Sequence, residues 1–305
     1  MRLAIVGLTW INNCGIHRHK LATLFVSVAG ASLVCREGAE KIMLNSTALC
    51  RAFLATLLCA LSAVALAQIT DINSAINKAG RQRMLSQRMA KAYFQIGLGV
   101  DTDRSRRVLE SSIDLFDGQL VELKNYAPSP EIRETYQKLE KAWQAYREAL
   151  NTATPNQGEG ARILALSEDV LALAQQGAQQ LERRSATTTG RLVNIAGRQR
   201  MLSQRMAKYY QAAAWKISIE QSGPEIDKGR REFSTALLEL AAAPNNTTAL
   251  REELELVKQQ WMFFENALNQ RGSVDKRQAT AVATTSERIL ETMENVVGQY
   301  ERLPK

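Results

Sequence analysis

Arginine is the residue type in this chain whose spacing points most clearly to chemistry. The stretch Ala79–Lys91 reads AGRQRMLSQRMAK, and the same 13 letters return at Ala196–Lys208, 117 residues later. The guanidinium group is planar, charged and carries five hydrogen-bond donors, so converging arginines suit a small planar oxyanion. An exact internal repeat of this length sets the architecture to be expected, and it favours one shared chemical role for both copies.

The repeated stretch is predicted to be helical, since it lacks Pro and is rich in strong helix formers. At about 100° per residue, Leu85 and Met89 fall on an ordinary core-facing stripe. A second face carries small, adaptable and polar residues, namely Gly80, Met84, Gln87 and Lys91, with Gly197, Met201 and Gln204 in the second copy. Glycine on this face lets another backbone come close.

Arginines flank this second face. If two such helices met about a two-fold axis, their guanidinium groups would converge, and like charges need an anion between them. The alternative is a solvated basic face whose arginine stems lie along apolar neighbours. We favour the anion, because a solvated face has no reason to keep Ser86 and Gln87 identical in both copies while the rest diverges.

The segment AINKAGRQRMLSQRMAKAY resembles the P-box of the sensor domain of nitrate/nitrite sensor histidine kinases. It is still more similar to the PilJ-type domain, named for the N-terminal part of type IV pili methyl-accepting chemotaxis transducers. The resemblance spans both copies, from about residue 68 onward, and is strong over the repeated stretch and weak elsewhere. It implies four-helix bundles and an anion held where two first helices meet. The implied anion ligands are Arg83, Arg88, Arg200 and Arg205, with Arg81 and Arg198 in less certain supporting positions.

Each repeat is expected to begin a module of four antiparallel helices. In the first module the helices are predicted at about 69–97, 102–124, 131–150 and from 161 onward, with Pro and Gly in the loops between them. The second module echoes the first, since Phe116 and Trp143 match Phe233 and Trp261 at offsets of 117 and 118. These aromatic residues are predicted to be core, and Pro224 and Pro244 are predicted to mark turns. The fold class is therefore all-α, with two tandem four-helix bundles at residues 68–188 and 189–305.

The joint between the modules contains no Pro from Ala161 to Trp215. We therefore expect a long connecting helix shared by the bundles, with a possible bend near Thr187–Gly190, where helix propensity is low. A continuous helix would stack the bundles end to end, and each repeat would then need a second subunit. A sharp bend would instead allow intramolecular pairing of the two modules. We favour the continuous helix and a homodimer.

Residues 43–67 have the pattern of a cleaved signal peptide, with a start at Met43, an apolar run and Ala65-Leu66-Ala67 as the cleavage site. This pattern predicts a periplasmic protein, and the alternative is an inner-membrane protein anchored by an uncleaved signal. Residues 1–42 are interpreted as an N-terminal extension that arises from a mis-assigned start. All four cysteines and both histidines lie in residues 1–67.

The remaining residues, 68–305, exclude several function classes. Without Cys or His they have no thiolate or imidazole metal site, and no nucleophile–base pair is evident, so we expect no metal, no cofactor and no enzyme. They hold 33 basic and 29 acidic residues, and a net charge of +4 does not indicate a nucleic-acid partner.

Two functions stay open from the sequence. The first is a periplasmic sensor or binding protein for a small inorganic anion, nitrate or nitrite, which passes its signal to a separate signalling or transport protein. The second is a non-enzymatic helical interaction protein of the envelope or the type IV pilus, in which the repeated face docks a partner.

Overall fold

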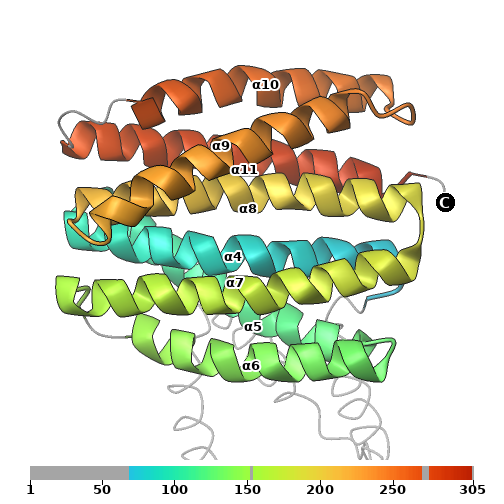
Figure 1. Cartoon of the computed structure of the whole chain (residues 1–305), viewed down its shortest axis with the longest axis horizontal. Coiled ribbons are helices and arrows are strands. Elements are labelled where there is room, and N and C mark those ends of the chain that lie inside the picture. Colours follow the sequence, from blue (N-terminus) through green and yellow to red (C-terminus); the bar gives the residue numbers. More distant parts are fainter. Residues whose placement is uncertain (1–68, 152–153, 270–274, 304–305) are drawn as a thin grey trace, which may run out of the picture. The chain divides into compact units, whose positions relative to one another are not determined.

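Helices make up all the regular structure in the residues that the computed structural model describes, 69–151, 154–269 and 275–303 (Figure 1). The expected N-terminal extension and signal peptide lie outside these residues. The all-α prediction is confirmed. The helices of the first module are α4 (Ile72–Leu98), α5 (Thr102–Tyr126), α6 (Pro130–Leu150) and α7 (Gln157–Ser185). Those of the second are α8 (Thr188–Ala214), α9 (Ile219–Ala241), α10 (Thr248–Asn269) and α11 (Lys276–Glu301).

The helix ends follow from local capping. The Asp71 carboxylate accepts the N–H of Asn73 at 2.8 Å and starts α4, and Gly99, with φ at 69°, ends it. Ser129 caps α6, which opens with a proline at its first position. In α7 the Asn156 side chain accepts the N–H of Glu159 at 3.0 Å, so the helix begins at Gln157 rather than near residue 161.

Pro224 was predicted to mark a turn, and that prediction is wrong. It lies inside α9, near the N-terminal end of the helix. A proline there removes one intrahelical hydrogen bond close to a helix end, which a helix with a well-packed apolar face tolerates. Ile226, Phe233 and Leu237 supply that buried face.

Each bundle has the same aromatic pair in its core. The ring centroids of Phe116 and Trp143 are 4.2 Å apart, and those of Phe233 and Trp261 are also 4.2 Å apart. All four side chains are buried, as predicted. The internal repeat therefore extends from sequence to packing.

The prediction of a continuous helix between the modules is wrong. Ala186 adopts a left-handed conformation with φ at 52°, which ends α7, and Thr187 caps α8 by accepting the N–H of Gly190 at 3.0 Å. The weak propensity predicted near Thr187–Gly190 thus produces a full reversal rather than a bend. As a result α8 runs antiparallel to α7 and parallel to α4 (Figure 1).

The two helices that carry the repeated stretches, α4 and α8, pack directly against each other in the middle of the fold. The other helices of the first module lie on one side of this pair and those of the second on the other (Figure 1). Residues 117 positions apart meet across the pair, which gives a pseudo-two-fold axis along the helices. One chain therefore brings both repeats together without a second subunit.

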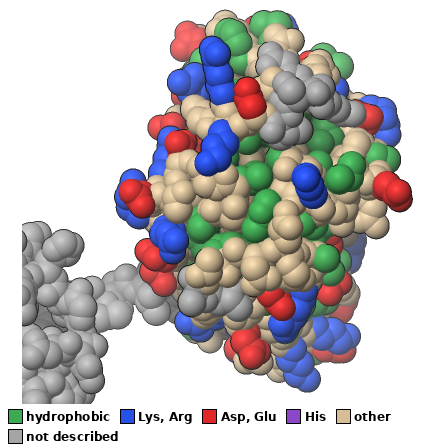
Figure 2. All heavy atoms as spheres, turned by 90° about the vertical axis from the view of Figure 1, so that its left-hand side faces the viewer, with side chains coloured by type: hydrophobic (Ala, Val, Ile, Leu, Met, Phe, Trp, Pro, Cys, Tyr) green, Lys and Arg blue, Asp and Glu red, His purple; other side chains and the backbone are tan. Residues whose placement is uncertain are grey.

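The end of the molecule shown in Figure 2 carries basic and acidic side chains interspersed around apolar ones, with no patch of a single charge. Within the described residues, no helix has both the length and the apolar character that a membrane span requires.

Candidate functional site

The crossing of α4 and α8 is built on two glycines. A Cβ added to Gly80 would lie 3.7 Å from the Cα of Gly197, and one added to Gly197 would lie 3.8 Å from the Cα of Gly80. Each hypothetical Cβ would also lie 3.2 to 3.4 Å from the Nη2 atoms of Arg83 and Arg200. The glycines thus leave at the axis the space into which two guanidinium groups extend.

The two arginines make reciprocal contacts across the axis. Nη2 of Arg83 donates to Oδ1 of Asn194 at 2.7 Å and to its carbonyl oxygen at 3.2 Å. Nη2 of Arg200 donates to Oδ1 of Asn77 at 2.9 Å and to its carbonyl oxygen at 3.2 Å. Both arginine side chains are fully buried, at 0 % exposure. Buried guanidinium groups are rare unless they are paired, so this juxtaposition calls for a functional explanation.

One donor of each group remains unused. Among the described residues, Nε of Arg83 and Nε of Arg200 are buried and have no hydrogen-bond partner. Most buried polar atoms in folded proteins are paired, so each unpaired donor is available to a small acceptor.

The two arginines differ in their charged partners. Nη1 of Arg200 donates to Glu294 on α11 at 2.5 Å, whereas Nη1 of Arg83 donates to the neutral amide of Gln175 on α7 at 2.6 Å. Burial, and then the charge of Arg200, lower the pKa of Arg83 to about 9, so its guanidinium stays protonated at neutral pH. Burial opposes ionisation of Glu294, but Arg200 and Arg81 outweigh it and hold the pKa of that carboxyl below its usual range.

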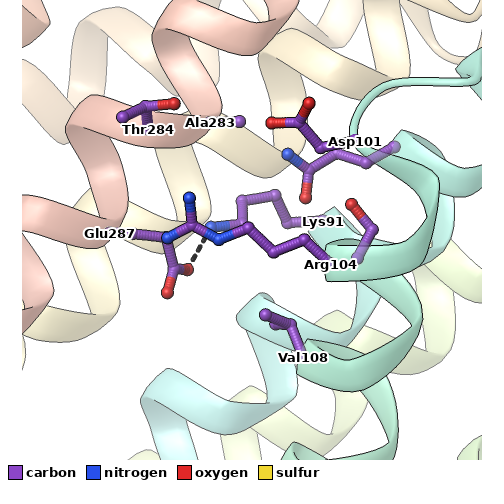
Figure 3. A pocket seen from close by; sticks show the side chains of 9 residues that line it. Lys91, Asp101, Arg104, Val108, Ala283, Thr284 and Glu287 are labelled. Carbon is purple, nitrogen blue, oxygen red and sulfur yellow. Dashed lines mark hydrogen bonds and ion pairs between the residues drawn. The ribbon is translucent and has the colours of Figure 1, made fainter.

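The other two predicted ligands, Arg88 and Arg205, do not join this pair. Arg88 forms a two-pronged ion pair with Glu287 on α11, at 3.1 Å and 2.6 Å, and the buried Lys91 donates to the same carboxylate at 2.5 Å. Figure 3 shows Lys91 and Glu287 in contact, with the side chain of Arg104 beside them. A cavity of about 20 Å³ adjoins them, which is room for about one water molecule.

Arg205 on α8 makes the arrangement that is related to that of Arg88 by the pseudo-two-fold axis. It binds Glu168 on α7 at 3.2 Å and 2.6 Å and Glu225 at 2.8 Å, while Lys208 donates to Glu168 at 2.5 Å. Burial works against the two shared carboxylates, but their cationic partners lower the pKa of Glu168 and of Glu287 to about 2. The pairs with Glu287 and Glu168 each join a helix of one module to a helix of the other, so they hold the two bundles together, whereas the pair of Arg205 with Glu225 lies within the second module.

The supporting residues predicted from the sequence also fall into two groups, those buried within the fold and the arginines that form ion pairs. Met84 and Met201 are buried, and the amides of Gln87 and Gln204 donate to the carbonyl oxygens of Ser167 and Ser286 at 2.9 Å and 3.0 Å. Arg81 binds Glu294 at 2.8 Å, but its counterpart Arg198 turns toward solvent and binds Glu232 at 2.7 Å. The structure thus brings Arg83 and Arg200 together and uses the remaining arginines in ion pairs.

Comparison with family models decides the classification. The PilJ model, described as the N-terminal part of type IV pili methyl-accepting chemotaxis transducers, matches residues 64–169 and again residues 181–287. The chain belongs to the PilJ family. A search of curated proteins and a search of solved structures each found no significant match. The PilJ family is named for chemotaxis transducers, so the two domains are of a sensory kind.

Four residues that contact the two central arginines were not identified from the sequence, namely Asn77, Asn194, Gln175 and Glu294. The two asparagines could have been found, because they stand 117 positions apart, just before the identical stretches. Gln175 and Glu294 are related by an offset of 119, but they are different residue types, so the repeat gave no signal for them. Within the described part of the PilJ domains, no cluster of acidic, Cys or His side chains could hold a metal ion.

Proposed function

We propose that this protein is a periplasmic sensor module that binds a small planar monoanion, nitrate or nitrite, at the crossing of α4 and α8. The anion would bind at the guanidinium pair formed by Arg83 and Arg200, one from each PilJ domain. The family supports the sensory role, and the P-box resemblance of the repeated stretches supports the choice of anion. The signal peptide predicted at residues 43–67 supports the periplasmic location.

The observation that carries this proposal is the state of Arg83. It is fully buried, it faces a second guanidinium group, and its hydrogen-bond acceptors among the described residues are the side-chain and backbone oxygens of Asn194 and the amide of Gln175. Burying a cation without a counter-charge in direct contact costs several kcal/mol of desolvation free energy. An anion bound there offsets that cost and relieves the repulsion between Arg83 and Arg200.

The expected affinity is modest. A charge-assisted hydrogen bond contributes about 1.5–3 kcal/mol. A ligand with four heavy atoms is bounded at about −1.5 kcal/mol per atom, or about −6 kcal/mol in total. That free energy corresponds to a Kd in the tens of micromolar. Binding would change how closely α4 and α8 approach, and a separate signalling or transport protein would receive this change.

The competing function, in which the repeated face docks a partner protein, requires that face to be exposed. Met84, Gln87 and Lys91 are instead buried against neighbouring helices, and so are Met201 and Gln204 in the second copy. The residues that set this face apart are therefore used within the chain, which favours the anion.

Calorimetric titration of the purified protein with nitrate at low chloride tests the proposal. We expect heat, one-to-one stoichiometry and a higher melting temperature. The double variant Arg83→Lys/Arg200→Lys keeps both charges but loses the planar donor geometry, so affinity should fall at least about ten-fold. Arg191→Lys, at a half-exposed arginine that pairs with Glu239 on the surface, is the matched control and should bind as the wild type does. Absence of heat and of a melting shift at millimolar nitrate and nitrite would falsify the proposal.

A further inference from the structure

The pseudo-two-fold symmetry of the site is broken at one pair of positions. Gln175 on α7 and Glu294 on α11 stand 119 residues apart, the same offset that relates Glu168 to Glu287. Each accepts a hydrogen bond from Nη1 of one central arginine, Gln175 from Arg83 and Glu294 from Arg200. The two halves of the site therefore have the same shape but differ by one negative charge.

This difference leaves the two central arginines in unlike electrostatic states. Glu294 is in direct contact with Arg200 and is shared with Arg81, which donates two bonds to it, at 3.2 Å and 2.8 Å. On the other side, the carboxylate of Glu182 bonds to Nδ2 of Asn194 and not to Arg83. Glu182 acts on Arg83 only through space, as Glu301 does on Arg200, so Arg83 is the central arginine without a carboxylate in direct contact among the described residues.

The two halves also differ in their access to solvent. A groove of about 340 Å³ opens between α7, α8 and α9, and Gln175 lies in its wall together with Arg198, Arg205 and Lys228. Gln175 is half-buried, so one side of its amide faces the groove while its oxygen contacts Arg83. Gln175 therefore both lines the groove and contacts Nη1 of Arg83.

The same place in the other half holds an ion pair, in which the side chains of Arg81 and Glu294 each keep 27 % exposure. There Arg81 spans to Glu294, whereas Arg198, its counterpart, is drawn away to Glu232 at 2.7 Å. The position that corresponds to Glu232 at an offset of 117 is Leu115, which offers Arg81 no carboxylate. This sequence difference explains why Arg81 stays beside Glu294, whereas Arg198 pairs with Glu232 and not with the residue at the corresponding position, Gln175.

We propose that the anion site is one-sided: a single monoanion reaches Arg83 through the groove and replaces the Gln175 amide oxygen on Nη1, while Glu294 acts as a built-in anion on Arg200. This inference rests on the proposed function and specifies its ligand class. A monoanion supplies the direct counter-charge that Arg83 lacks, whereas a dianion such as sulfate would carry a second charge into a buried site, so we expect sulfate to be rejected. The groove is lined by three basic residues and by two acidic ones, Glu168 and Glu232, so its lining keeps a small positive excess toward an incoming anion.

Exchange of the two residues tests the charge assignment. Gln175→Glu places a carboxylate on Arg83, so nitrate affinity should fall at least about ten-fold, the effect of losing one charge-assisted bond. Glu294→Gln should keep nitrate affinity within about three-fold of the wild type or tighten it, and should admit sulfate. Gln176→Glu, at an exposed neighbouring position, is the charge control and should bind nitrate normally.

The double exchange Gln175→Glu/Glu294→Gln separates sidedness from net charge, because its total charge equals that of the wild type. If only the charge mattered, it would bind nitrate normally; the one-sided site instead predicts weak binding, as in Gln175→Glu alone. Melting curves would establish that each variant is folded. Equal affinity in the double exchange and the wild type would overturn the inference, and so would equal losses in the two single variants.

Filling the groove tests the route. Ala172 is exposed in the groove wall, and Ala172→Trp should slow or abolish nitrate binding. Glu291, its counterpart on α11, is also exposed, and Glu291→Trp should have no effect. Nitrate binding that survives Ala172→Trp unchanged would contradict access through the groove. If the wild type itself fails to bind, the proposed function is at fault rather than its one-sidedness.

Discussion

The Nη2 atoms of Arg83 and Arg200 converge on one point of the α4–α8 crossing, since both lie 3.2 Å from the place that a Cβ on Gly80 would occupy. Two buried cations are held at this point by hydrogen bonds to Asn194 and Asn77 rather than by a carboxylate between them. The site is therefore organised before any ligand arrives, which reduces the ordering cost of binding.

Replacement of Gly80 by alanine measures how tightly this point is packed. Alanine in a helix interior normally stabilises by about 0.5–1 kcal/mol relative to glycine. Gly118→Ala in α5 should show that gain in urea unfolding, because an added Cβ there meets nothing within 4 Å. Gly80→Ala should gain less or lose stability, because the Cβ displaces both guanidinium groups, and its nitrate affinity should fall. Equal stabilisation by the two substitutions would contradict the close crossing.

Removal of a carboxylate that joins the two bundles should weaken their packing and lower the free energy of unfolding. Glu287→Gln leaves Lys91, 1 % exposed, without its counter-charge, and Glu168→Gln does the same to Lys208. Breaking a buried pair typically costs about 3–5 kcal/mol, and we expect the lower end because both glutamates are partly exposed. Glu134→Gln, which breaks an exposed pair with Lys138, should leave the free energy of unfolding nearly unchanged, because solvent screens that pair. Similar costs at buried and exposed pairs would refute this role.

Stability should fall in acid for the same reason. The pKa of Glu168 and of Glu287 is about 2 in the folded protein, below the usual value of 4.5. A lowered pKa stabilises the folded state above the unfolded value, and that contribution is lost as the pH falls from about 4.5 toward 2. Each glutamate should contribute on the order of 2–3 kcal/mol at neutral pH. Urea unfolding between pH 7 and pH 3 measures this loss, and a Glu168→Gln/Glu287→Gln variant should show a much flatter pH dependence.

Two buried tyrosines of α6 should respond oppositely to loss of the hydroxyl. Among the described residues, the hydroxyl of Tyr136 has no hydrogen-bond partner, whereas that of Tyr146 donates to the carbonyl oxygen of Ser86 at 2.8 Å. Tyr136→Phe should leave the free energy of unfolding unchanged or raise it by up to about 1 kcal/mol, and Tyr146→Phe should lower it by about 1 kcal/mol. Thermal unfolding of both variants under one condition checks the contrast, and a cost at Tyr136 would reveal a partner for its hydroxyl.

Much of the fold could be predicted from local signals. Apolar periodicity and the positions of Pro and Gly placed the helices of the first module and the matched aromatic cores, because these depend on residues close in the chain. The reversal at Ala186 could not be predicted, since alanine favours helix and its left-handed conformation is imposed by the packing of α8 on α4. The low helix propensity near residues 187–190 indicated where the chain changes direction, but not by what angle.

The candidate site was predictable only in part. The repeat and its glycine identified the face where Arg83 and Arg200 meet, because identical helices packed in parallel bring identical positions together. The role of Arg88 and Arg205 in joining the modules depends on Glu287 and Glu168, which lie 199 and 37 residues away along the chain. No periodic pattern encodes such long-range pairs, and the anion role of all four arginines stays a prediction.

The left-handed turn at Ala186 has a consequence for sensing at low abundance. A receptor whose pocket is shared by two subunits loses that pocket when the protein is diluted below its dimer dissociation constant. Here a short covalent connection keeps both repeats permanently within reach of each other, so the effective concentration of one for the other does not depend on how much protein is present. The response to an anion should then follow the anion concentration alone, even when the cell makes only a few copies of the chain.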